Sequence, residues 1–117
     1  MTRVSVSGYN ERLYLEAVGH SVAGDEFAAT GAIERKKESE RVCAAVSILM
    51  LSAASRLREM DSNGDFVSAC ITVESGYALF DIEPREDARE RVEEIIEMTV
   101  CGISLLEEGY PELVSLV

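Results

Sequence analysis

The stretch ESERVCAAVSILMLSAASRL, residues 38–57, decides the architecture because it has the pattern of a long amphipathic helix. Its apolar side chains recur at helical spacing and form one stripe, made of Val42, Val46, Leu49, Met50, Ala53 and Leu57. We expect the helix to run from about residue 39 to residue 60, with Ser39 as its N-cap. Cys43, the one reactive side chain of this stretch, then lies in the first turns of the helix.

The segments around this helix have the patterns of β-hairpins. Residues 2–7 and 11–18 alternate between apolar and polar side chains on either side of a short turn. Residues 66–73 and 77–83 are rich in β-branched and aromatic residues and are also separated by a short turn. Each pair of segments therefore predicts two antiparallel strands.

A second long helix follows the second hairpin. Pro84 opens it with acidic residues in the first turn, and Gly109 is the residue expected at its C-terminal cap. The resulting order ββαββα predicts an α/β (α+β) fold, a two-layer sandwich of two helices on one face of a mostly antiparallel sheet. The opposite face of that sheet needs cover, and dimerisation is one way to supply it.

The length of 117 residues is that of a single domain, so residues 1–117 are interpreted as one unit. Residues 21–38 mix glycine, alanine and charged side chains without a sustained period. We expect a mobile loop there, because long segments of this kind inside compact domains rarely have a purely structural role. A helical turn near residues 32–38 is the one candidate for regular structure within the loop.

The composition excludes several classes of partner. With 22 acidic and 11 basic residues, the net charge of −11 argues against nucleic acid and favours either a cationic partner or simple solubility. The N-terminus has no apolar targeting core, and the longest apolar stretch is too short to cross a membrane. The three cysteines are widely spaced, so neither a disulfide framework nor a metal site is expected. These features predict a cytoplasmic protein without a metal or another cofactor.

Cys43 and the single histidine, His20, are candidates for a nucleophile and its base. His20 lies where the second strand ends, and the loop after it returns to the helix of Cys43. A histidine can accept the thiol proton, while the N-terminus of a helix stabilises a thiolate and can bind an oxyanion. The plainer alternative, a turn histidine and a core cysteine, stays open at this point. Cys70 in a strand and Cys101 in the last helix are expected to be inert packing residues.

Two motifs resemble the ribosomal-processing cysteine protease family. The first is GHS at residues 19–21, which is similar to that family's Gly-His-Ala with Ser21 in place of the alanine. The second is VCAAVSILMLSAASRL at residues 42–57, which matches its Val-Cys-Ala-Ala-Val-Ser and the apolar helix that follows. The closing GYPELV, residues 109–114, resembles the family's Tyr-Pro ending. The resemblance covers nearly the whole chain, although the loop between the two motifs is longer here than in the family.

The resemblance implies a homodimeric cysteine endopeptidase with a two-layer α/β fold. Its substrate would be the N-terminal extension of large-subunit ribosomal protein number twenty-seven, cut next to an aromatic residue, with Cys43 as nucleophile and His20 as base. Glu40 occupies the place of the family's aspartate, and Ser47 lies one helical turn beyond Cys43, so both are candidates for orienting His20. The alternative function is a non-catalytic dimeric binding module of the same fold that associates with ribosomal proteins.

Overall fold

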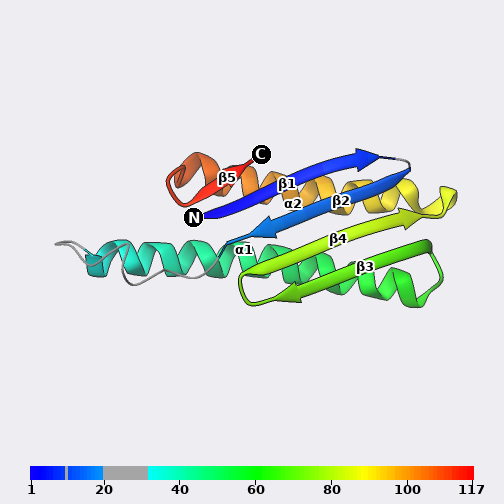
Figure 1. The fold of residues 1–117 in the computed structure, drawn as a ribbon, viewed down its shortest axis with the longest axis horizontal. Helices are drawn as coiled ribbons and strands as arrows, with labels where there is room; N and C mark the ends of the chain where they lie inside the picture. The colour runs from blue at the N-terminus through cyan, green and yellow to red at the C-terminus, as the bar shows by residue number, and fades with distance from the viewer. Residues whose placement is uncertain (10, 20–31) are drawn as a thin grey trace.

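The computed structural model describes residues 1–9, 11–19 and 32–117, which form one five-stranded sheet covered on one face by two helices (Figure 1). The strands are β1 (Thr2–Tyr9), β2 (Arg12–Val18), β3 (Phe66–Glu74), β4 (Tyr77–Pro84) and β5 (Val114–Leu116). The helices are α1 (Ala32–Ser62) and α2 (Arg89–Gly109), the latter preceded by the short 3-10 helix η2 (Glu86–Ala88). The predicted two-layer α+β fold is confirmed.

The sheet has the order β3-β4-β2-β1-β5, and every pair of neighbouring strands is antiparallel except β1 and β5. Both predicted hairpins are present, because the alternation of their side chains matches the pleat of a sheet that is buried on one face. Strand β5 was not predicted. Its three residues carry too short a pattern, and its pairing with β1 depends on partners at the other end of the chain.

The prediction for the start of the central helix was wrong. Helix α1 begins at Ala32, seven residues earlier than expected, and Ser39 is a buried residue inside the helix and not its N-cap. Residues 32–38 consist mainly of alanine, glutamate, lysine and arginine, which favour helix, and no glycine or proline interrupts them. This part of the predicted loop is therefore helical. Residues 21–31, the rest of that loop, lie outside the described residues.

The core lies between the sheet and the two helices. The largest side chains without solvent exposure come from both layers, namely Phe80, Leu15, Leu57, Met60, Ile82 and Ile103. The helices also contact each other closely, since a Cβ atom on Gly102 of α2 would lie 2.7 Å from Cδ2 of Leu49 in α1. This packing fixes α1 on the sheet and thereby fixes the direction in which Cys43 points.

The sheet face opposite the helices carries polar contacts between strands. Arg12 Nε of β2 donates a hydrogen bond of 2.8 Å to Oδ1 of Asp81 in β4. The hydroxyl of Tyr77 in β4 donates one of 3.0 Å to Glu16 in β2. Cross-strand pairs of this kind stabilise a solvated face without another protein layer. Dimerisation on this face therefore stays a prediction.

Candidate active site

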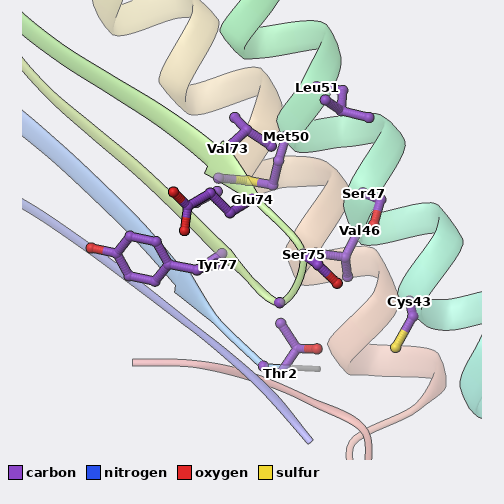
Figure 2. A pocket seen from close by; sticks show the side chains of 14 residues that line it. Thr2, Cys43, Val46, Ser47, Met50, Leu51, Val73, Glu74, Ser75 and Tyr77 are labelled. Atoms are coloured by element: carbon purple, nitrogen blue, oxygen red, sulfur yellow. The ribbon is translucent and has the colours of Figure 1, made fainter. Parts of the chain in front are cut away.

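A cleft with a volume of about 390 Å³ lies at the end of the sheet where β2 ends and α1 passes, and Figure 2 shows side chains that line it. Its walls come from the start of β1, the end of β2, the turn between β3 and β4, and one side of α1. The lining residues with polar side chains are Thr2, Cys43, Ser47, Glu74, Ser75 and Tyr77, and Gly19 and Gly76 contribute backbone. The volume is within the range of small-molecule and peptide side-chain pockets.

Gly19 is fixed between two walls of this cleft. A Cβ atom on Gly19 would lie 2.6 Å from both Cα and Oγ1 of Thr2, so no larger residue fits without a shift of the backbone. The Gly19 N–H also donates a hydrogen bond of 3.0 Å to the carbonyl oxygen of Gly76 in the β3–β4 turn. The glycine of the GHS motif is thus required by close packing, and it joins β2 to both neighbouring segments.

Cys43 is half-buried and its sulfur points into the cleft (Figure 2). It lies eleven residues beyond Ala32, in the fourth turn of α1. Only the first four N–H groups of a helix lack an intrahelical acceptor, so the backbone around Cys43 offers no such donor. The prediction that a helix N-terminus would stabilise the thiolate and bind an oxyanion was therefore wrong.

The structure brings together some of the predicted site residues. Ser47 lines the cleft beside Cys43, whereas the exposed Glu40 is not among its lining residues. His20 lies outside the described residues, so its pairing with Cys43 stays a prediction. Gly19, the residue bonded to His20, does line the cleft.

The prediction that Cys70 and Cys101 are packed in the interior was wrong, because both are exposed. On β3 the partly buried hydrophobic residues that pack against the core are Ala69, Ile71 and Val73, so the pleat turns Cys70 to the other face. On α2 the buried stripe runs through Thr99 and Ile103, which leaves Cys101 on the outer side. Cys70 and Cys101 therefore differ from Cys43 in facing solvent outside the cleft.

Thr2 and Ser75 were not predicted as site residues. Thr2 begins an ordinary alternating strand, and Ser75 belongs to a short turn for which many residues would serve. Only the pairing of β1, β2 and β4 places the two beside Cys43. In residues 1–9, 11–19 and 32–117, no three histidine, cysteine, aspartate or glutamate side chains gather as metal ligands would. No helix in that part of the chain is long and apolar enough to span a membrane.

No family model and no curated protein matches this sequence. Solved structures do match over nearly the whole chain. SMU.848 from Streptococcus mutans is 25% identical with a TM-score of 0.65, covering 99% of this chain and 91% of its own. The ribosomal processing protease Prp from S. aureus, in complex with a substrate peptide, is 16% identical with a TM-score of 0.65, covering 100% and 98%.

A second S. aureus Prp structure, with a covalently linked product peptide, is 15% identical with a TM-score of 0.61, covering 99% of this chain and 97% of its own. The fold and the cleft thus define a two-layer α+β protein with a cysteine in a cleft at one end of its sheet. Its fold is that of the ribosomal processing protease Prp. The resemblance of the motifs to this family is therefore confirmed at the level of the fold.

Proposed function

We propose that this protein is a cysteine endopeptidase in which Cys43 is the nucleophile and His20 its base. The observation that carries the proposal is that Cys43 points into a cleft also lined by Gly19, the residue bonded to His20. The shared fold supports it, because the two S. aureus structures hold a substrate peptide and a covalently linked product peptide. Ser47, one helical turn from Cys43 in the same cleft, is the stronger candidate for orienting His20.

The reaction has two stages joined by a thioester intermediate, and in each stage His20 takes up one proton and gives it back. His20 takes the thiol proton of Cys43, and the sulfur attacks the scissile carbonyl carbon, so that an S–C bond forms and the π electrons move to the oxygen. When the C=O bond re-forms, the C–N bond breaks and the leaving amine takes the proton from His20. Water, deprotonated by His20, then hydrolyses the thioester and the thiol of Cys43 is restored.

The substrate in this proposal is the N-terminal extension of large-subunit ribosomal protein number twenty-seven, cut next to an aromatic residue. The apolar side chains of Val46, Met50 and Leu51 line the cleft beside Cys43 and suit an aromatic ring (Figure 2). The net charge of −11 favours approach of a basic ribosomal protein. This substrate implies action in the cytoplasm, and the resemblance implies a homodimer, for which light scattering on a sizing column is the test.

The test uses a synthetic peptide with the sequence of that extension, a second peptide with alanine in place of the aromatic residue, and mass spectrometry of the products. We expect the wild type to cut the first peptide next to the aromatic residue and to cut the second one much more slowly. Cys43→Ala should bind the first peptide without cutting it, while the control Cys101→Ala, outside the cleft, should cut it normally. Binding without cleavage by the wild type would favour the non-catalytic module instead.

A further inference from the structure

The attack of Cys43 on a peptide carbonyl places negative charge on the carbonyl oxygen, and that oxygen requires a hydrogen-bond donor. Proteins that catalyse acyl transfer supply such donors in advance, aimed at the position of the developing charge. The N–H groups around Cys43 are already used inside α1, because Cys43 lies in the fourth turn. Among the described residues, the remaining donors are side chains that line the cleft.

Among the described residues, three aliphatic hydroxyls line the cleft, those of Thr2, Ser47 and Ser75. Thr2 is 7% exposed and its Oγ1 lies against Gly19, which limits its reach toward a bound peptide. Ser47 belongs to the same helix face as Cys43 and therefore to the same wall. Ser75 alone combines exposure with a place on the wall across from α1, and its hydroxyl points into the cleft (Figure 2).

The position of Ser75 is also fixed. It belongs to the two-residue turn between β3 and β4, whose second residue, Gly76, has a φ of 76° that favours glycine. The carbonyl of Gly76 accepts the hydrogen bond of 3.0 Å from Gly19, which holds the turn against the end of β2. A donor held in this way needs little rearrangement when charge develops on a bound carbonyl. In the described part of the chain, the Ser75 hydroxyl makes no hydrogen bond, so it is available to a bound peptide.

We propose that the Ser75 hydroxyl donates a hydrogen bond to the oxyanion formed when Cys43 attacks the scissile carbonyl. The peptide then lies between α1 and the β3–β4 turn, with the sulfur on one side of the carbonyl group and the hydroxyl on the other. The proposal rests on the proposed function, because it assigns a catalytic residue to the same peptidase reaction. It replaces the helix terminus as the source of oxyanion stabilisation.

The test compares Ser75→Ala and Ser75→Thr with the wild type, with Ser52→Ala on the exposed side of α1 as the matched control. Loss of one oxyanion donor lowers kcat by about 100-fold in comparable enzymes. We therefore expect Ser75→Ala to lose about 100-fold in kcat with little change in KM. Ser75→Thr keeps a hydroxyl and should recover most of the rate, and Ser52→Ala should behave as the wild type.

Two further measurements separate this role from a structural one. A peptide aldehyde forms a hemithioacetal on Cys43 that resembles the transition state, so Ser75→Ala should weaken its inhibition by about the same factor as kcat. Alkylation of Cys43 by iodoacetamide forms no oxyanion, so its rate should not change in Ser75→Ala. An equal loss in alkylation would instead indicate damage to the site and overturn the proposal.

The outcomes distinguish this proposal from the proposed function. If the wild type cuts the peptide and Ser75→Ala cuts it equally fast, the role of Ser75 is wrong and the peptidase stands. If the wild type neither cuts the peptide nor binds the aldehyde covalently, the peptidase is wrong and the role of Ser75 is overturned with it.

Discussion

The Cα atom of Thr2 would lie 2.6 Å from a Cβ atom on Gly19, so the start of β1 and the end of β2 meet where no side chain fits. The same glycine donates its N–H to the β3–β4 turn that carries Ser75. One backbone position therefore aligns three walls of the cleft, and it immediately precedes His20 in the chain. Close packing against Thr2 thus explains why the first residue of the GHS motif is a glycine.

Gly19→Ala should destabilise the fold and impair cleavage. The added methyl group meets backbone and not a flexible side chain, so the walls must separate, and overpacking of this kind costs about 1–3 kcal/mol. Gly109→Ala is the matched control, because a Cβ atom there has nothing within 4 Å. Urea unfolding should show a lower free energy of unfolding for Gly19→Ala alone. Equal stability of the two variants would contradict the described contact between β1 and β2.

The relative reactivity of the three cysteines tests whether Cys43 is activated. If exposure alone set the rate, Cys70 and Cys101 would react first, because both are exposed whereas Cys43 is half-buried in a cleft. A histidine that accepts the thiol proton reverses that order near pH 6.5, where few ordinary thiols are ionised. Brief iodoacetamide treatment followed by mass spectrometry should therefore label Cys43 fastest.

Two controls belong to this labelling experiment. In denatured protein the three cysteines should react at similar rates, because neither the cleft nor the proposed pairing with His20 persists. His20→Ala should slow Cys43 below Cys70 and Cys101 in the folded protein. Two results would count against the catalytic pair. One is that Cys43 is labelled more slowly than Cys70 and Cys101 in the wild type, and the other is that its labelling rate is the same in His20→Ala.

The contact between Tyr77 and Glu16 should make stability depend on pH in the alkaline range. The hydrogen bond to the Glu16 carboxylate raises the pKa of Tyr77 above its ordinary value of 10.0. Because the pKa of Tyr77 is higher in the folded state than in the unfolded state, the contact stabilises the fold fully at pH values below the unfolded-state pKa. This contribution is lost as the pH rises through the folded-state pKa. Spectrophotometric titration should place Tyr77 lower in Glu16→Gln, and Tyr77→Phe should lose this part of the pH dependence. An unchanged titration in Glu16→Gln would show that the contact is absent.

Leu57→Ala tests the contact of α1 with the sheet. Leu57 has no solvent exposure, so its truncation leaves a cavity and should lower the free energy of unfolding by about 2–5 kcal/mol. Leu105→Ala is the control of the same chemistry, since Leu105 is 65% exposed and should change stability by less than about 0.5 kcal/mol. Denaturant unfolding of both variants measures the difference. Similar values would mean that α1 packs with a different face.

Much of the fold could be predicted because its signals are local. The hairpins follow from alternation and the helices from their apolar stripes, and both required only neighbouring residues. The start of α1 was missed because a serine before an apolar run looks like a cap, whereas Ser39 is buried inside the helix. Strand β5 depends on the distant β1 for its partner.

The candidate site was predictable only in part, because some of its residues are brought together by pairing between distant segments. Cys43 and Ser47 are one helical turn apart, so their common position follows from the helix alone. Ser75 reaches the cleft through the pairing of β4 with β2, which no short motif encodes. Cys43 was expected near the helix N-terminus, but α1 begins at Ala32, so the expectation that helix-terminal N–H groups would bind an oxyanion there was wrong.

The most direct test of the central claim is a double-mutant cycle on His20 and Cys43, measured as kcat/KM on the peptide with the ribosomal extension sequence. If the two residues perform one step together, His20→Ala and Cys43→Ala should each abolish most cleavage, and the double variant should lose little more. Cys43→Ala should still fold, because that position is followed by two alanines in a stable helix. Undiminished cleavage by either single variant, or losses that simply multiply in the double variant, would contradict the proposed catalytic pair.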